Sequence, residues 1–331
     1  MAKKKPTGVV IGDPAGIGPE ITVKALSDPA LYRASQPILI GDSAVVERAL
    51  QIANVRMEIR PLGSLAEARL DYPVLNVFDL HFSELKDLPM GRLSPASGRA
   101  FVHWFRKAYE LAQEGGLGAI AYAPLNKEAV HAAGYPYHDE IDMLKDFSGD
   151  PDLFLLALST AGRFRTASVP PLHISLRQAC DQLSMEAVLH SLLLLREGLG
   201  RLGIPDPVIG VAALNPHGGE SGLHGDEEAR LILPAIQRAR EKGIDARGPF
   251  PPDTVFFRAK GGEFDCVLGM YHDQTRIAMK MVDFRKIIYS TLGTSSHFVS
   301  PAHGTAFDIA GKGIADANNF KLALKYAAKV R

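Results

Sequence analysis

The sequence predicts an α/β protein with a mainly parallel β-sheet covered by helices on both faces. Strand-like and helix-like segments alternate along the 331 residues, which is the order that produces parallel strands joined by helical crossovers. Several strand-like segments are continuous apolar runs, as is typical of strands buried on both faces. A chain of this length can form one large α/β unit or two subdomains. No repeat or flexible linker separates its parts, so we expect any subdomains to be interleaved.

The N-terminal segments follow this alternation in order. Residues 8–11 form an expected strand, and the glycine- and proline-rich loop GDPAGIGPE follows it. Pro19 and Glu20 open a helix that runs through Leu26, because proline fits a first helical turn and an acidic side chain favours the positive end of the helix. An amphipathic helix is expected over residues 94–114. Further strands are expected at residues 37–41, 74–77 and 118–124.

The C-terminal half contains three apolar runs that lead to histidines. A helix is expected over residues 183–197, with its leucine run 192–195 in the core. The stretch 265–280, DCVLGMYHDQTRIAMK, begins like a buried strand and then reaches His272. His217 closes the apolar run of VIGVAALNPHGGE, and His173 lies in SVPPLHISLR. Open α/β sheets bind ligands at the carboxyl ends of their strands.

Three neutral imidazoles placed in this way could share one divalent ion and leave positions open for water or substrate. The alternative is that they are unrelated loop or core histidines, because no HxH or HExxH spacing links them.

The composition excludes several classes of protein. Lys+Arg and Asp+Glu both number 37, so no overall charge favours nucleic acid or an anionic membrane. The basic run Lys3–Lys5 is expected to be a solvated tail. The chain contains two cysteines, Cys180 and Cys266, and neither a signal-peptide pattern nor a long apolar span. These features predict a cytoplasmic protein with no disulfide and no nucleic-acid or membrane partner.

One glycine pattern imitates a dinucleotide-binding fingerprint. Residues 198–203, GLGRLG, fit GxGxxG, but they follow a helix and precede a strand. That order is the reverse of the one that places a pyrophosphate at a helix N-terminus. We therefore interpret this segment as a helix stop.

Six stretches, in this order and spacing over nearly the whole chain, carry a resemblance to a known family: IGDPAGIGPEITVKAL, YAPLNKEAVHAAG, NPHGGESGLHGDEEAR, GPFPPDTVF, MYHDQTRIAMK and HGTAFDIAGKG. They resemble the 4-hydroxythreonine-4-phosphate dehydrogenase family of vitamin B6 synthesis and its side branches, which include dehydrogenases of terephthalate- and phthalate-type cis-dihydrodiols. The resemblance implies an isocitrate/isopropylmalate dehydrogenase-like α/β/α sandwich with two interleaved subdomains. We expect these at residues 1–130 plus 285–331 and at residues 131–284.

The resemblance also implies a reaction and a set of site residues. It implies a homodimer with active sites at the subunit junction. It further implies one divalent ion (Mg, Mn, Zn or Co) held by His173, His217 and His272. The implied reaction is oxidation, by NAD or NADP, of a hydroxyl β to the carboxylate of a small hydroxy acid, with decarboxylation.

Other residues are candidates for substrate and cofactor contacts. Lys127 and Asp253 are candidates for proton transfer or substrate orientation, and the alternative is a surface lysine and a turn aspartate. We expect the cofactor to bind at the C-terminal motif and not at GxGxxG. The cofactor residues expected there are Ser300, His303, Gly304 and Thr305.

The sequence departs from the family at its phosphate pocket. The family usually has a Gly-His-Thr-Glu turn, a lysine after the HDQ motif, and then an asparagine and an arginine. Here the turn holds His138 and Asp139, the lysine is Lys280, and Tyr289 and Phe298 stand at the last two positions. A carboxylate repels phosphate, and an aromatic ring does not replace a bidentate guanidinium.

We therefore expect a non-phosphorylated substrate, such as a cis-dihydrodiol dicarboxylate lying against Phe298 and Tyr289. One alternative is a 4-hydroxythreonine-4-phosphate or threonate-4-phosphate dehydrogenase with a rebuilt phosphate site. The other is a non-catalytic binding protein, against which the intact histidines argue.

Overall fold

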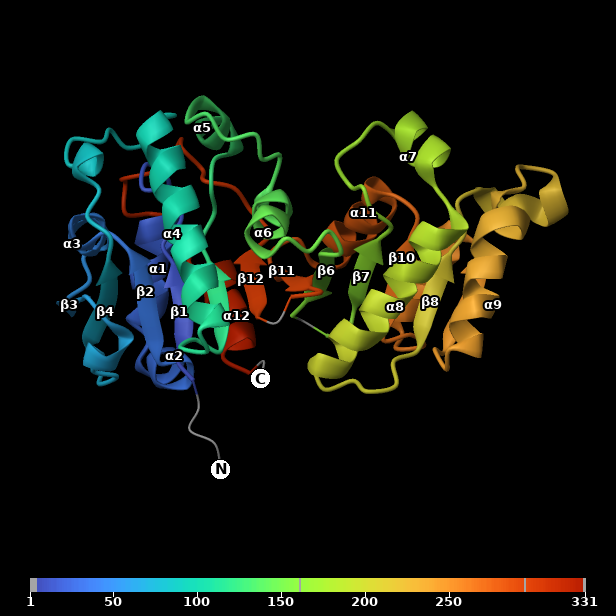
Figure 1. The fold of residues 1–331 in the computed structure, drawn as a ribbon, viewed down its shortest axis with the longest axis horizontal. Coiled ribbons are helices and arrows are strands. Elements are labelled where there is room, and N and C mark those ends of the chain that lie inside the picture. Colours follow the sequence, from blue (N-terminus) through green and yellow to red (C-terminus); the bar gives the residue numbers. More distant parts are fainter. Residues whose placement is uncertain (1–4, 161, 295, 330–331) are drawn as a thin grey trace. The chain divides into compact units, whose positions relative to one another are not determined.

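A computed structural model of the protein describes residues 5–160, 162–294 and 296–329 (Figure 1). Lys3 and Lys4, expected in a solvated tail, lie outside the described residues. The chain forms two compact units, Met1–Leu153 with Thr294–Arg331, and Phe154–Gly293. It leaves the first unit and later returns to it. The predicted α/β class is confirmed.

The first unit contains a parallel sheet whose strand order is β3-β4-β2-β1-β5-β12. Strand β12, drawn in red in Figure 1, comes from the C-terminal segment and pairs in parallel with β5. The strands of this unit are β1 (Thr7–Val10), β2 (Pro37–Gly41), β3 (Glu58–Leu62), β4 (Val74–Asp79), β5 (Ala119–Tyr122) and β12 (His297–Pro301). Its helices are α1 (Gly18–Leu26), α2 (Pro29–Ser35), α3 (Ser43–Ala53), α4 (Pro95–Gln113), α5 (Lys127–Ala132), α6 (Glu140–Ser148) and α12 (Asn318–Ala327).

The second unit has the strand order β11-β6-β7-β10-β8-β9. Strands β7, β10, β8 and β9 are parallel, whereas β6 is antiparallel to both of its neighbours. Its strands are β6 (Phe154–Ser159), β7 (Arg165–Ser168), β8 (Ile209–Ala212), β9 (Ala246–Phe250), β10 (Cys266–Gly269) and β11 (Ile287–Leu292). Its helices are α7 (Leu176–Gln182), α8 (Met185–Arg201), α9 (Leu233–Glu241), α10 (Pro252–Lys260) and α11 (His272–Asp283).

The boundaries between the units differ from those expected at residues 130 and 284. Helix α6 belongs to the first unit because it packs on α4: the ring of Phe147 lies 6.1 Å from that of Tyr109, and the Arg106 guanidinium lies 4.0 Å from the Phe147 ring centroid. Strand β11 belongs to the second unit because it pairs with β6 along its whole length. Both differences arise from contacts between segments far apart in the sequence.

The GxGxxG segment forms the end of helix α8, which runs four residues further than predicted. Gly198 lies inside this helix, where a Cβ atom would be 2.5 Å from Leu292 Cδ1. The lack of a Cβ atom at Gly198 therefore permits close packing of the helix on β11. Gly203, with φ of 87°, lies just beyond the helix. The segment is a helix terminus, as interpreted. The leucine run within α8 is only partly core, because Leu192 and Leu195 are buried whereas Leu193 faces outward.

Both cysteines are free thiols, and Cys266 is buried in β10. In the described parts of the chain, no helix combines the length and apolar character needed to cross a membrane.

Candidate active site

The sheet of the second unit brings the three predicted histidines to one edge. Strands β7, β10 and β8 are parallel neighbours, with β10 in the middle. His173, His272 and His217 each follow the carboxyl end of one of these strands. Since parallel strands end at the same edge of a sheet, all three lie at the edge where α/β proteins bind ligands.

The turn that presents His272 is held by buried hydrogen bonds. His272 is the first residue of α11. Gln274 Oε1 accepts from Met270 N at 2.7 Å, and Gln274 Nε2 donates to Ala213 O, beyond β8, at 2.8 Å. The hydroxyls of Thr275 and Ser168, at the end of β7, lie 2.6 Å apart. The helix start is therefore tied to both neighbouring strand ends.

His173 and His272 form a pair suited to a metal ion. Their ring centroids are 5.5 Å apart, close to the roughly 5 Å spacing of two imidazoles bound to one tetrahedral ion with metal–nitrogen distances of about 2.1 Å. Burial lowers the pKa of His272, and the nearby Arg276 and His173 lower it further, against a hydrogen bond with Asp273. A lowered pKa favours the neutral imidazole, which is the form that binds metal.

His217 lies in a loop with an unusual backbone. His217, Gly218, Gly219, Glu220 and Ser221 all have positive φ, from 45° to 78°. Left-handed backbone is unfavourable for residues with a Cβ atom, and such strain persists only where the surrounding structure enforces it. Strain of this kind is concentrated at functional sites.

A buried carboxylate anchors this loop. Glu228 Oε1 accepts from Leu214 N at 2.9 Å and from Asn215 N at 2.8 Å. Glu228 Oε2 accepts from Asn215 Nδ2 at 3.0 Å. Glu228 is only 6% exposed. It therefore fixes the backbone just before His217.

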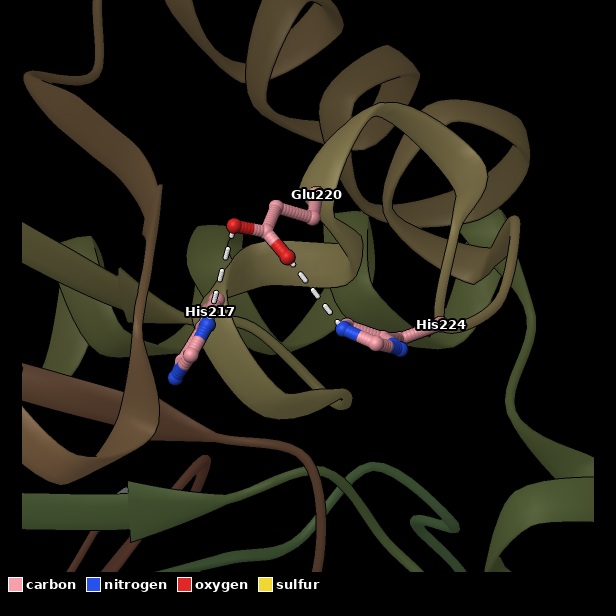
Figure 2. Close-up of side chains that lie close together, drawn as sticks. All are labelled: His217, Glu220 and His224. Atoms are coloured by element: carbon pink, nitrogen blue, oxygen red, sulfur yellow. Dashed lines mark ion pairs between the residues drawn. The ribbon is translucent and has the colours of Figure 1, made fainter.

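His217 is grouped with two residues that the sequence reasoning missed (Figure 2). Glu220 lies between His217 and His224, with ion-pair distances of 3.8 Å to His217 Nδ1 and 3.2 Å to His224 Nε2. Their potential ligand atoms all lie within 4.8 Å of one another. Among the described residues this is the only such group of three, so one chain does not assemble His173, His217 and His272 as a compact triad. The spacing H-x2-E-x3-H in NPHGGESGLHG was the available signal.

The other predicted residues of the second unit lie near these elements. Asp253 is exposed in the first turn of α10, directly after β9. Lys280 is exposed near the end of α11, with Nζ 5.9 Å from the Phe284 ring centroid. Tyr289 on β11 contacts a residue that the sequence reasoning missed, Arg276, whose guanidinium carbon lies 4.7 Å from the ring centroid.

The first unit has its own edge of strand ends. Strands β1, β5 and β12 are parallel neighbours, and β12 leads into the predicted cofactor segment. Ile17 N donates to Thr305 O at 3.0 Å. A Cβ atom at Gly16 would lie 2.9 Å from Thr305 Cβ, so glycine is required for this contact. The loop after β1 therefore packs against the C-terminal motif.

The cofactor segment has features that fit a ligand. Ser300 and Thr305 are buried. His303 Nε2 is buried without a hydrogen-bond partner, and burial lowers the His303 pKa. Nothing lies within 4 Å of a Cβ atom placed on Gly304. The unpaired His303 Nε2 and the open space at Gly304 are compatible with a bound nucleotide.

Lys127 and His138 lie around the start of α6. Lys127 is the first residue of α5, and its Nζ is 4.0 Å from Glu140 Oε2. The His138 ring lies 5.8 Å from that of His131. These are polar, accessible side chains on connected elements of the first unit.

Two predicted substrate residues have other roles. Asp139 is the N-cap of α6, where its Oδ1 accepts from Ile141 N at 2.9 Å and from Asp142 N at 3.0 Å. Its negative charge is thus engaged with the helix start. Phe298 is fully buried on β12, with its ring 5.3 Å from Phe105 and 6.5 Å from Tyr109. The expectation that Phe298 lines the substrate pocket is wrong, since its side chain packs in the core.

Asp13, in the loop after β1, supports a prediction about pH. It is 1% exposed, and burial raises its pKa from 3.8 to about 6. The folded state therefore binds more protons than the unfolded state between these values, and stability falls as pH rises through that window. We expect Asp13→Asn to remove this loss, raising the unfolding free energy at pH 8 by up to about 3 kcal/mol. The gain should vanish below about pH 4.

Urea unfolding of both proteins across this range measures the difference. The exposed Asp206→Asn serves as the control. A gain that is the same at pH 4 and pH 8 contradicts the assignment to Asp13 titration.

Comparison with known proteins identifies the family. The family model described as pyridoxal phosphate biosynthetic protein PdxA matches residues 33–327. This chain belongs to the PdxA family. A 4-hydroxythreonine-4-phosphate dehydrogenase from Desulforapulum autotrophicum is 38% identical over 330 residues, covering 99% of this chain and 96% of that protein. A putative D-threonate 4-phosphate dehydrogenase from Symbiobacterium thermophilum is 39% identical, covering 97% and 95%. The family predicted from the six motifs is thus confirmed.

Solved structures agree with this PdxA assignment. The 4-hydroxythreonine-4-phosphate dehydrogenase from Klebsiella pneumoniae is 37% identical with a TM-score of 0.89, covering 98% of each chain. A terephthalate 1,2-cis-dihydrodiol dehydrogenase from Burkholderia xenovorans is more distant, at 28% identity and a TM-score of 0.66, covering 96% of this chain and 95% of that one. A β-decarboxylating dehydrogenase from Thermococcus kodakarensis, 14% identical with a TM-score of 0.50 over 97% and 81%, shares the fold. The predicted α/β/α fold is confirmed.

Proposed function

We propose that this protein is a metal- and nicotinamide-dependent dehydrogenase that oxidises the hydroxyl of a phosphorylated hydroxy acid, of the 4-hydroxythreonine-4-phosphate or threonate-4-phosphate type. The observation that carries the proposal is the near full-length similarity to relatives with those names. The expectation of a non-phosphorylated ring substrate has weaker support. The terephthalate 1,2-cis-dihydrodiol dehydrogenase from Burkholderia xenovorans is only 28% identical to this chain. Asp139 caps helix α6 and Phe298 packs in the core, so neither residue favours a ring substrate.

We place the metal at the histidine edge of the second unit, where three imidazoles follow neighbouring strand ends. A divalent ion bound there would lower the pKa of the substrate hydroxyl. His173 and His272 would hold it, together with His217. Asp253 and Lys127 remain our candidates for proton transfer or orientation. NAD or NADP would accept the hydride, and the resulting 3-keto acid can then lose carbon dioxide.

Wild-type turnover tests the function. NADH formation should be measured with 4-hydroxythreonine 4-phosphate, D-threonate 4-phosphate and a cis-dihydrodiol dicarboxylate. Each compound should be tested with each of the four metals. NADPH formation from NADP should be measured in parallel. We expect a phosphorylated compound to have at least a tenfold higher kcat/KM, about 1.4 kcal/mol in transition-state binding. A better cis-dihydrodiol substrate contradicts the proposal. Measured carbon dioxide release tests the decarboxylation.

We place the nicotinamide cofactor at Ser300, His303, Gly304 and Thr305. Because Gly304 faces open space, Gly304→Val should fold normally and yet weaken cofactor binding about tenfold or more, roughly 1.4 kcal/mol. Gly200→Ala, in the GxGxxG segment, is the matched control and should change affinity by less than about twofold. Calorimetric titration with NAD measures both, and the opposite ranking excludes this placement.

We also propose a homodimer whose subunits share the active sites. An apolar row is exposed on another face of α11 and its C-cap, made of Ile277, Met281 and Phe284, which are 62%, 82% and 70% exposed. Exposed apolar rows of this kind commonly mark protein contacts. Sedimentation analysis gives the oligomeric state directly.

A further inference from the structure

A buried arginine on α11 has no acidic partner among the described residues. Arg276 is 4% exposed, and its Nη1 has no hydrogen-bond partner. No carboxylate forms an ion pair with it within the described parts of the chain, and burial lowers its pKa. The guanidinium instead lies over the ring of Tyr289, with its carbon 4.7 Å from the ring centroid. A buried charge without a partner is costly to the fold.

Two other arginines of this protein bond to backbone carbonyls. Arg48, which is half-buried, donates Nη1 to Leu88 O at 3.1 Å and Nη2 to Pro14 O at 3.0 Å. Arg240 donates Nε to Ala246 O at 2.7 Å. Arg276 makes no comparable bond, so stabilising the fold does not explain its presence. Its donors are available for an anion that binds from outside.

The position of Arg276 places that anion in the candidate active site. His272, Arg276 and Lys280 are spaced four residues apart on α11, so they lie along one face of the helix about 6 Å apart per turn. The metal-site histidine thus lies one turn before Arg276, and the exposed Lys280 one turn after it. A substrate whose hydroxyl is held near His272 would extend its far end toward Arg276 and Lys280.

We propose that Arg276 binds the terminal oxyanion of the substrate, namely the phosphate of the phosphorylated hydroxy acid. This inference rests on the proposed function. Arg276 would take the place of the arginine that the resemblance implies in the phosphate pocket. Phe298, at the position where the resemblance implies an arginine, lies in the core, whereas α11 supplies a guanidinium beside Tyr289. A guanidinium presents paired donors to phosphate or carboxylate, so both anions share the recognising chemistry.

The test compares Arg276→Met with wild type by thermal unfolding and by kinetics. Without added anion, we expect the variant to melt at the same or a higher temperature, because a costly unpaired charge has been removed. Inorganic phosphate should raise the melting temperature of wild type but not of the variant. The KM for the phosphorylated substrate should rise at least about tenfold. Affinity for the metal, titrated alone, should be unchanged.

Two further variants separate specific from general effects. Arg285→Met removes an exposed arginine just beyond α11 and should keep the full phosphate-induced shift. Arg276→Lys keeps the charge without the paired donors and should keep a reduced shift. If Arg276→Met fails to fold, Arg276→Lys still reports on phosphate, and an undiminished shift in it overturns the proposal.

The remaining outcomes are equally decisive. A variant that melts lower without anion yet keeps its phosphate shift shows a structural arginine and overturns the proposal. An Arg276-dependent shift with malonate but not with phosphate overturns the phosphate assignment in favour of a carboxylate. Wild-type turnover of the phosphorylated substrates with an unchanged KM in Arg276→Met rejects this inference and leaves the proposed function intact. Absence of that turnover rejects the function instead.

Discussion

Replacing His272 with alanine is expected to lower kcat/KM by at least about a thousandfold without unfolding the protein. A catalytic metal contributes several kcal/mol to the transition state, and about 4 kcal/mol corresponds to this factor. The fold should survive because the turn is held by Gln274 and Thr275, through their bonds to Ala213 and Ser168, and not by the imidazole. The His272 side chain itself is 37% exposed.

The measurement combines metal titration, kinetics and circular dichroism. His173→Ala should give a similar loss, and the double variant should lose little more, since we propose that both side chains bind one ion. His103→Ala, an exposed histidine of the first unit, is the matched control and should retain activity. Full activity of the wild type after exhaustive chelation would show that no metal is involved.

Replacing Glu228 with alanine is expected to disorganise the loop that carries His217. The change leaves the Leu214 and Asn215 donors without their acceptor. Hydrogen bonds to charged groups contribute about 1.5–3 kcal/mol each, so the unfolding free energy should fall by about 3 kcal/mol or more. The left-handed run from His217 to Ser221 then loses its anchor. Activity should fall about 10- to 100-fold, the range typical of residues that orient metal ligands.

Matched variants separate this effect from simple loss of charge. Glu228→Gln keeps an oxygen for the two backbone donors and should lose less than alanine in both stability and activity. Glu241→Ala removes an exposed carboxylate at the end of α9 and should change neither. Equal, small effects of all three substitutions would mean that Glu228 does not position His217. Urea unfolding and kcat/KM measured on the same samples provide both readouts.

Local patterns were sufficient for most elements of secondary structure. Pro37–Gly41 is a strand with the predicted ends, and the predicted helix over residues 94–114 is α4, Pro95–Gln113. Both signals lie within the segment itself, as a continuous apolar run or as a helical repeat of apolar residues. The pairing of β6 with β11 and the assignment of α6 to the first unit have no such local signal. They depend on partners more than a hundred and about forty residues away, respectively.

By itself, the sequence determined the family, the α/β class and the placement of three histidines after strand ends, because motifs and apolar runs are properties of contiguous residues. Only the tertiary structure decided which side chains face the site. Phe298 lies in the core because side chains alternate between the two faces of a strand, and the register of β12 on β5 sets its direction. The sequence did not indicate a role for Arg276, because a charged residue in a helix is expected to be exposed. Its burial depends on contacts that form only in the tertiary structure. Packing of α11 on the sheet buries this charge beside Tyr289, and no acidic side chain among the described residues pairs with it. A buried charge of this kind is stabilised when an anion binds to it.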